Sequence, residues 1–193
     1  MIEKSRIEEV LIESGALLHG HFILASGRHS DRYMQCAQIL QYPRFTRELA
    51  ACLAEEFAGD NIDAVIAPAV GGIIIGYEIA RRLDTRNLFA ERENGVLTIR
   101  RNFTLPKGSR TLIVEDVVTT GGTVFELIDV VLRAGGEIAG VALIADRSGG
   151  TVDFGVKTRA AYTTEILSYT PDECPLCKEG DIPAVKPGTS GTR

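Results

Sequence analysis

Thr111–Thr123 reads TLIVEDVVTTGGT, and this stretch decides the predicted fold. Its first four residues are β-branched or aliphatic, which is typical of a buried strand. Two adjacent carboxylates, Glu115 and Asp116, follow, and then a loop of small residues, Thr119–Thr123. From Val124 to Val131 apolar residues recur with a helical period, and a glycine pair ends the pattern. The order strand, acid pair, loop and helix predicts an α/β fold with an open, mainly parallel sheet flanked by helices.

The loop has the properties of a phosphate-binding site. In an open parallel sheet, ligands bind beyond the carboxyl ends of the strands. Small residues there let backbone N–H groups approach a ligand, and the helix that follows adds a partial positive charge. Glu115 and Asp116 would repel the same phosphate, so they suit hydroxyl groups or a metal. A phosphorylated sugar fits both halves of the site.

The segment VEDVVTTGGT resembles the 5-phosphoribosyl-1-pyrophosphate (PRPP) motif of type I phosphoribosyltransferases. The resemblance implies that family's fold, with an N-terminal hood and a mobile β-hairpin. It also implies that Glu115 and Asp116 hold the ribose 2- and 3-hydroxyls. The residues that would bind the 5-phosphate are Val118, Thr119, Thr120, Gly121, Gly122 and Thr123.

Two other interpretations of this stretch stay open. A carboxylate at a strand end also occurs in ATPases, and a capped strand-to-helix turn can exist without any ligand. The sequence contains neither GxxxxGK[ST] nor GxGxxG, so the usual nucleotide-binding loops are missing.

A second glycine turn repeats the arrangement. A strand is predicted at Ile62–Ala67 and a helix at Ile73–Leu83, with Gly71 and Gly72 between them. The family resemblance implies that backbone amides of this loop bind the pyrophosphate of PRPP. Alternatively, the two glycines only permit tight packing of the helix on the strand.

A hairpin with cationic residues is predicted next. Strands at Asn87–Arg92 and Leu97–Arg101 flank an Asn-Gly turn, a strong two-residue hairpin signal. The resemblance implies that this hairpin closes over the active site and, in a homodimer, reaches the neighbouring subunit. Arg92 then corresponds to a pyrophosphate-binding arginine. Arg100 and Arg101 are the candidate catalytic cations, because the loop lysines and histidine of well-known members are missing.

The N-terminal segment FILASGRHSDRY resembles the signature of orotate phosphoribosyltransferases that covers the pyrimidine. Strands near Phe22–Leu24 and Arg32–Cys36 are predicted around a turn. The resemblance implies substrate-binding roles for Ser26, Gly27 and Tyr33. As alternatives, the first two residues are only turn-forming and the tyrosine belongs to the core.

Arg147 follows a continuous apolar strand at Ile138–Ala145. The resemblance implies that this arginine holds orotate, and the alternative is a surface salt bridge to Asp146. Two further strands, Val152–Thr158 and Ala160–Leu167, are expected to complete the sheet edge.

The implied reaction transfers the phosphoribosyl group of PRPP to orotate, giving orotidine 5-monophosphate and pyrophosphate. The implied cofactor is Mg²⁺, carried mainly by PRPP, without a dedicated set of protein ligands. A phosphoribosyltransferase for another base, or a non-catalytic PRPP-sensing regulator, remains as a rival.

Composition sets the remaining expectations. At 193 residues, with 45% hydrophobic and 24% charged residues, the chain fits one globular domain. That domain would comprise an N-terminal helix and hood (1–42), a core (43–167) and an extended tail (168–193) with a disordered end. A net charge of −5 argues against nucleic acid as a partner. The absence of a long apolar run or a signal sequence predicts a cytoplasmic protein that contacts no membrane.

Cys174 and Cys177 form a CPLC motif. A structural zinc site usually needs four ligands in two such pairs. Cys36 and Cys52 lie far away in sequence without that spacing, and His19 and His21 show no partner pattern. Reduced thiols are therefore expected, with a zinc site or a redox pair as alternatives. His29 is expected to be a hydrogen-bonded structural residue.

Overall fold

The computed structural model of the chain describes residues 3–187. The expected disorder at the end of the tail concerns residues outside this range. Among the described residues, no helix is both long and apolar enough to cross a membrane.

The core of the molecule is a six-stranded sheet with the order β5-β4-β3-β6-β7-β8. All neighbouring strands run parallel except the hairpin pair β4 and β5. The predicted open, mainly parallel sheet is therefore confirmed, and the central position belongs to the strand that carries the acid pair. The strands are β3 (Ala64–Pro68), β4 (Arg86–Glu93), β5 (Val96–Ile99), β6 (Arg110–Val118), β7 (Glu137–Asp146) and β8 (Thr158–Thr163).

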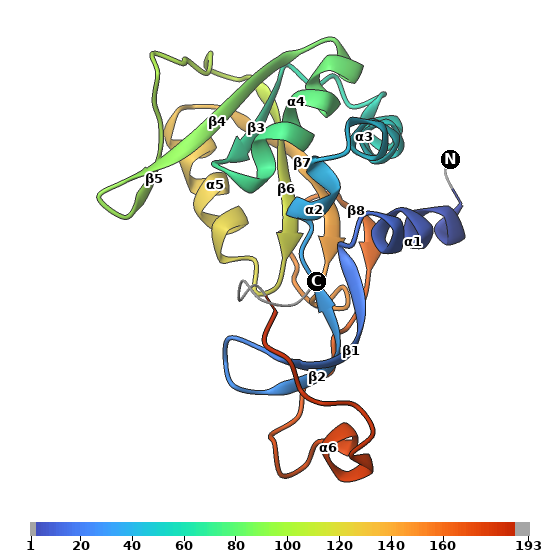
Figure 1. The fold of residues 1–193 in the computed structure, drawn as a ribbon. Helices are drawn as coiled ribbons and strands as arrows, with labels where there is room; N and C mark the ends of the chain where they lie inside the picture. The colour runs from blue at the N-terminus through green and yellow to red at the C-terminus, as the bar shows by residue number, and fades with distance from the viewer. Residues whose placement is uncertain (1–2, 188–193) are drawn as a thin grey trace.

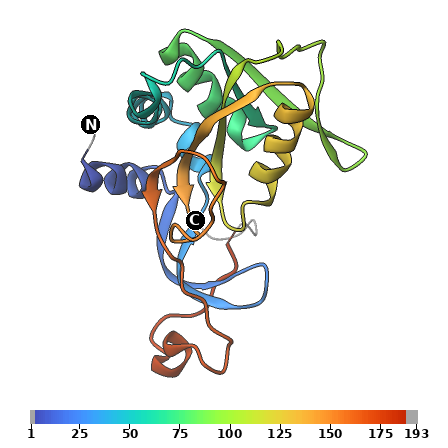
Figure 2. The same ribbon diagram turned by 180° about the vertical axis from the view of Figure 1, so that it is seen from behind.

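Helices cover both faces of this sheet (Figures 1 and 2). α3 (Pro43–Phe57) and α4 (Gly71–Leu83) pack on one face, and α5 (Gly122–Arg133) packs on the other. Within β3 the side chains alternate, since Val65 belongs to the cluster under α3 and α4, whereas Ile66 belongs to the cluster under α5. Burial on both faces explains why the strands read as continuous apolar runs. α1 (Lys4–Glu13) buries Ile7, Val10 and Leu11 against the first cluster.

A separate hairpin forms the hood. β1 (Leu17–Ile23) and β2 (His29–Met34) pair antiparallel and lie beyond the carboxyl ends of β6 and β7 (Figure 1). Both strands begin earlier in the sequence than predicted. The short helix α2 (Ala37–Leu40), which the sequence analysis did not predict, joins this hairpin to α3.

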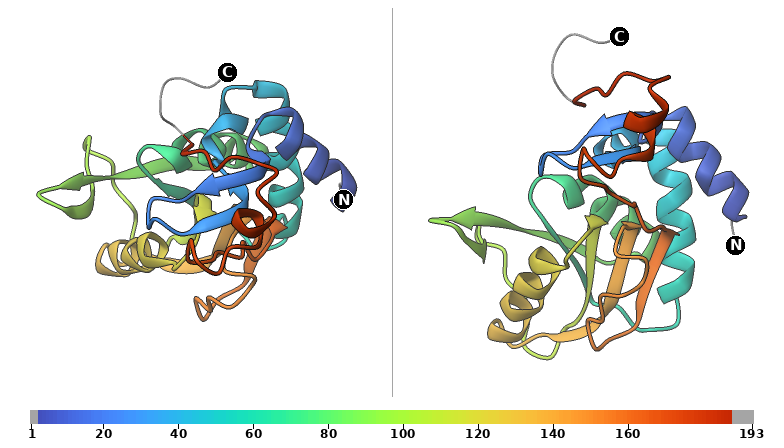
Figure 3. Two further views of the ribbon diagram at one scale, coloured as in Figure 1. Left: turned by 60° about the horizontal axis from the view of Figure 1, so that its bottom comes forward. Right: turned by 90° about the horizontal axis from the view of Figure 1, so that it is seen from below.

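The C-terminal tail packs against the hood (Figure 3). Tyr169 exchanges two backbone hydrogen bonds with His29, each 2.8 Å long. Further along, Val185 accepts a backbone hydrogen bond from Ile23 and donates one to His21. Between these contacts the tail forms α6 (Pro175–Glu179), so it is not extended throughout as expected.

One strand prediction is wrong. Val152–Thr158 forms a loop up to residue 157, and β8 ends at Thr163 rather than continuing to Leu167. The alternating apolar residues that suggested a strand belong to this loop instead. Val152 and Phe154 pack against the cluster beneath α5. The rings of Phe154 and Phe125 lie 5.0 Å apart. Alternation of apolar residues thus reflects a loop that closes over the first turn of α5.

Gly140 provides a test of the close packing between β7 and α3. A Cβ atom at Gly140 would lie 2.6 Å from the Lys157 carbonyl oxygen and 2.6 Å from Cε1 of Phe57. We expect Gly140→Ala to lower the free energy of unfolding by about 1–3 kcal/mol, the usual cost of overpacking a core. The control is Gly59→Ala, where a Cβ would meet nothing within 4 Å. Urea unfolding curves that coincide for the two variants would contradict this packing.

Candidate active site

The predicted phosphate loop lies at the junction of β6 and α5. Gly121 is the N-cap residue of α5, and no side chain caps the helix. The N–H groups of the first helical turn have no intrahelical acceptor, so they are available to a ligand. A cavity of about 240 Å³ opens at this point. It is lined by Glu115, Val117, Val118, Thr119, Thr120, Gly121, Gly122, Thr123, Val124 and Glu126.

Gly121 is required here for two reasons. Its φ of 80° lies in the left-handed region, which residues with a side chain rarely adopt. A Cβ would also lie 2.8 Å from Cγ1 of Val152 and 2.9 Å from Cε1 of Phe154. The loop between β7 and β8 therefore fixes the backbone that turns from β6 into α5.

The acid pair lies within β6, near its carboxyl end, whereas the sequence analysis ended the strand before Glu115. Glu115 is 7% exposed, and its Oε1 accepts a hydrogen bond of 3.1 Å from the backbone N–H of Asp116. Burial raises the pKa of Glu115 to about 9, and the Asp116 carboxylate adds to the increase. At neutral pH Glu115 therefore holds a proton and can donate as well as accept a hydrogen bond. This property suits a hydroxyl partner.

The glycine turn after β3 meets the acid pair. A Cβ at Gly71 would lie 2.7 Å from Oδ2 of Asp116, so only glycine leaves room for this carboxylate. Gly72 has a packing role, because a Cβ there would meet Cδ of Pro68 at 2.8 Å and the Val114 carbonyl oxygen at 3.0 Å. The tight-packing interpretation thus holds for Gly72, whereas Gly71 borders the candidate site.

Arg147 lies at the carboxyl end of the neighbouring strand β7. Its backbone N–H donates to the Val118 carbonyl at 2.8 Å, which ties this residue to the phosphate loop. The Nε of Arg147 is buried and has no hydrogen-bond partner within residues 3–187. Asp146 instead accepts hydrogen bonds from the N–H and hydroxyl of Ser148, and no Arg147–Asp146 ion pair forms in the described chain. A buried donor without an acceptor is costly, so this Nε–H is available to a ligand or a water molecule.

The buried thiol of Cys36 lies near the charges of both Asp116 and Arg147, and its pKa responds to each. Burial raises its pKa, the Asp116 carboxylate raises it further, and the Arg147 guanidinium lowers it. The carboxylate and the guanidinium therefore act on the same point at the carboxyl end of the sheet.

The three predicted cations form ion pairs with nearby carboxylates. Arg92 binds both carboxylate oxygens of Glu126 in α5, at 2.9 and 3.0 Å. Arg101 pairs with Glu91 at 2.7 Å, and Arg100 pairs with Glu93 at 3.2 Å. None of the three lines the cavity described above.

Glu126 is a cavity residue that the sequence analysis missed. It lies three residues after Thr123, so it shares a face of α5 with the phosphate loop. Its carboxylate would repel a phosphate, and the bidentate pair with Arg92 offsets its charge. Helical spacing from the loop was the signal that could have identified it.

The hood residues occupy a turn and a strand. Gly27 has a φ of 78°, and the Ser26 hydroxyl oxygen accepts a hydrogen bond of 3.4 Å from the Arg28 N–H. Tyr33 packs its ring 5.9 Å from that of Phe22 and donates a hydrogen bond to Gln35. Turn chemistry explains the conformation at Ser26 and Gly27, and their predicted contact with a pyrimidine stays a prediction.

Comparison with known proteins agrees with this geometry. The profile of the phosphoribosyl transferase domain matches residues 35–157. The chain belongs to the phosphoribosyltransferase family. An orotate phosphoribosyltransferase of Pelotomaculum thermopropionicum is 54% identical over 186 residues, covering 96% of this chain and 97% of the relative. That of Thermotoga maritima is 46% identical over 187 residues, covering 97% and 100%.

A solved structure supports the same placement within the phosphoribosyltransferases. The orotate phosphoribosyltransferase of Aeropyrum pernix has a TM-score of 0.68 and 28% identity, covering 81% of this chain and 93% of that protein. The fold and the orotate phosphoribosyltransferase resemblance deduced from the sequence are both confirmed.

The raised pKa of Glu115 predicts how the stability of this phosphoribosyltransferase depends on pH. Above pH 4.5 the unfolded chain releases this proton, whereas the folded chain keeps it up to about pH 9. The free energy of unfolding should therefore fall between these values, by at most about 1.4 kcal/mol per pH unit. Glu115→Gln removes this contribution, so its stability should decline less over the same range. Parallel pH profiles of urea unfolding for the two proteins would contradict the assignment.

Proposed function

We propose that this chain transfers the 5-phosphoribosyl group of PRPP to orotate, giving orotidine 5-monophosphate and pyrophosphate. The observation that carries the proposal is the meeting of three groups at the carboxyl ends of adjacent strands. These are the uncapped amides of α5, the acid pair of β6, and the half-buried side chain of Arg147, whose buried Nε has no hydrogen-bond partner within residues 3–187. They match the phosphate, the diol and an anionic base, respectively.

The reaction places a ring nitrogen of orotate on C1 of the ribose. A bond forms between that nitrogen and C1, the bond from C1 to the pyrophosphate oxygen breaks, and its electron pair leaves with pyrophosphate. The proton of the ring nitrogen passes to pyrophosphate or water. Positive charge develops on the sugar ring as this bond breaks. Catalysis then depends on positioning and electrostatic stabilisation rather than on a covalent intermediate.

The loop Val118–Thr123 would anchor the 5-phosphate through backbone amides. Charge-assisted hydrogen bonds of this kind contribute about 1.5–3 kcal/mol each. Glu115 and Asp116 would hold the two ribose hydroxyls. With both ends of the sugar fixed, C1 is held in place for attack.

The leaving group needs positive charge. We propose that the substrate is the Mg²⁺ complex of PRPP, because the acid pair would be occupied by the ribose hydroxyls and the cavity, within the described residues, offers no dedicated set of protein ligands for the metal. Arg92 is the nearest candidate cation, because its partner Glu126 lines the cavity. Arg100 and Arg101 would reach the site only when the β4–β5 hairpin leaves the position it has in Figure 1.

The β4–β5 hairpin extends away from the body of the protein (Figure 1), which supports a homodimer in which it reaches the neighbouring active site. Mixing an Asp116→Asn variant with an Arg100→Ala, Arg101→Ala double variant tests this sharing. Partial return of activity is expected, and no return after verified subunit exchange would contradict it.

We also propose a cytoplasmic location, where the four cysteines, which form no disulfide here, would stay reduced.

A turnover assay tests the proposed reaction. Purified protein is mixed with PRPP, Mg²⁺ and orotate, and the loss of orotate absorbance is followed. The same assay with adenine, hypoxanthine and uracil tests the alternative bases. Turnover is expected with orotate and with none of the other three bases. Turnover only with another base, or PRPP binding without turnover of any base, would contradict the proposal.

Arg147→Ala separates the roles of the two substrates. The lost guanidinium should raise the KM for orotate by about 10- to 100-fold, the effect of removing about 1.5–3 kcal/mol of charged hydrogen bonding. The KM for PRPP should change much less. Lys157→Ala is a control, because this cation pairs with Asp60 on a different part of the surface. Equal increases in both KM values for Arg147→Ala would contradict an orotate-binding role.

A further inference from the structure

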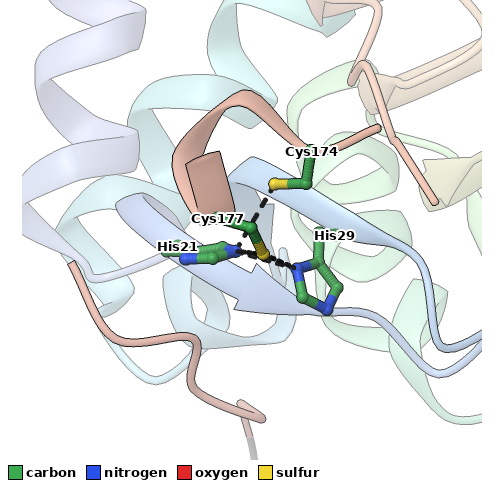
Figure 4. A group of neighbouring side chains, drawn as sticks. All are labelled: His21, His29, Cys174 and Cys177. Atoms are coloured by element: carbon green, nitrogen blue, oxygen red, sulfur yellow. Dashed lines mark hydrogen bonds between the residues drawn. The ribbon is translucent and has the colours of Figure 1, made fainter. Parts of the chain in front are cut away.

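Four side chains with metal-binding atoms converge where the tail meets the hood (Figure 4). His21 comes from β1, His29 begins β2, Cys174 is the N-cap residue of α6, and Cys177 lies within α6. One nitrogen or sulfur atom of each residue lies within 4.8 Å of the others. The sequence shows no partner pattern for His21, because Cys174 and Cys177 lie about 150 residues further along the chain.

Three nitrogen–sulfur separations in this cluster are close to the edges of a tetrahedron around zinc, whereas the two nitrogens lie closer together than the edge of about 3.3 Å that zinc would set. With Zn–S bonds of about 2.3 Å and Zn–N bonds of about 2.0 Å, a nitrogen–sulfur edge measures about 3.5 Å. Nε2 of His21 lies 3.5 Å from Sγ of Cys174 and 3.5 Å from Sγ of Cys177. Nδ1 of His29 lies 3.2 Å from Sγ of Cys177 and 2.8 Å from Nε2 of His21.

A second set of contacts orients His21 as a ligand. Its Nδ1 lies 2.9 Å from the Ile182 carbonyl oxygen. A carbonyl can only accept, so Nδ1 carries the proton and Nε2 presents its lone pair to the cluster. A histidine held by a backbone carbonyl in this way is typical of metal sites. Three of the four side chains are buried, since His21 is 3%, His29 8% and Cys174 0% exposed, and Cys177 closes the site on its exposed side.

The tail needs such a support. α6 has five residues, none of them buried, and a helix of this length is not stable by itself. Its position nevertheless fixes two cysteines against two histidines of the hood. Apolar burial within the helix cannot account for this, whereas a bound metal contributes folding free energy directly.

We propose that His21, His29, Cys174 and Cys177 form a structural Zn²⁺ site that fastens the C-terminal tail to the hood hairpin. Two thiolates and two imidazoles in a closed tetrahedral arrangement favour zinc over harder cations. The expectation that the two cysteines are plain reduced thiols is replaced by this assignment. A redox pair would need no histidines, yet both imidazoles face the sulfur atoms.

The metal content of the purified protein tests the site. The wild type is purified under reducing conditions, equilibrated with Zn²⁺ alone, desalted and analysed by mass spectrometry for metals. One zinc per chain is expected. Cys177→Ala changes an exposed residue and should still fold, and it should retain at least tenfold less zinc. Cys52→Ala, a cysteine in α3 outside the cluster, is the matched control and should retain one zinc.

Two further measurements make the test independent of activity. Replacing zinc by Co²⁺ should produce the visible absorption of a tetrahedral site with thiolate ligands in the wild type and in Cys52→Ala only. A chelator should lower the Tm of these two proteins by several degrees and leave that of Cys177→Ala unchanged. The proposal would be overturned if the wild type held no zinc after equilibration, or if Cys177→Ala held as much zinc as the wild type. Iron in place of zinc, or a Cys174–Cys177 disulfide, would also overturn it.

Discussion

The structure depends on one backbone junction, where β6 turns into α5 with its first amides uncapped. Burial of β6 on both faces fixes the position of its carboxyl end. Gly121 then makes the turn in a left-handed conformation, with Val152 and Phe154 packed where a side chain would be. The N–H groups beyond the turn have no intrahelical acceptor, so an anion can satisfy them. The neighbouring features of the site are arranged around this anion position.

Charge is distributed around that junction so that a phosphate and a carboxylate can coexist. Burial keeps a proton on Glu115, which removes part of the repulsion that an acid pair would exert on a nearby phosphate. Arg92 offsets the charge of Glu126, the other carboxylate at the cavity. Arg147 remains without an acceptor for its buried Nε among the described residues. In the proposed reaction, the anionic base would accept a hydrogen bond from this Nε.

Local sequence pattern was enough to predict most of the fold. The helix predicted at Ile73–Leu83 is α4, which begins two residues earlier at Gly71 and ends at Leu83 as expected. Asn94 and Gly95 adopt positive φ, as the two-residue hairpin requires. The same reasoning failed at Val152, because alternation of apolar residues does not distinguish a strand from a loop folded over a helix end. It also ended the strand before the acid pair, although Glu115 is buried within β6.

Long-range contacts account for the parts of the site that could not be predicted. A CxxC pair supplies two candidate zinc ligands, yet nothing in the spacing of His21 and His29 shows that the tail returns to them. The pairing of Arg92 with Glu126 likewise joins a hairpin to a helix 34 residues away. The phosphate loop and the acid pair could be predicted from a motif because their residues are adjacent in sequence. Three-dimensional packing was needed to show that Gly71 borders Asp116 and that Gly72 serves packing.

A structure of the protein with PRPP and Mg²⁺ bound would examine the junction directly. The 5-phosphate is expected against the backbone amides of Thr119–Thr123, with the ribose 2- and 3-hydroxyls within hydrogen-bonding distance of Glu115 and Asp116. Pyrophosphate against the α5 amides, or a ribose turned away from both carboxylates, would contradict the role assigned to this junction.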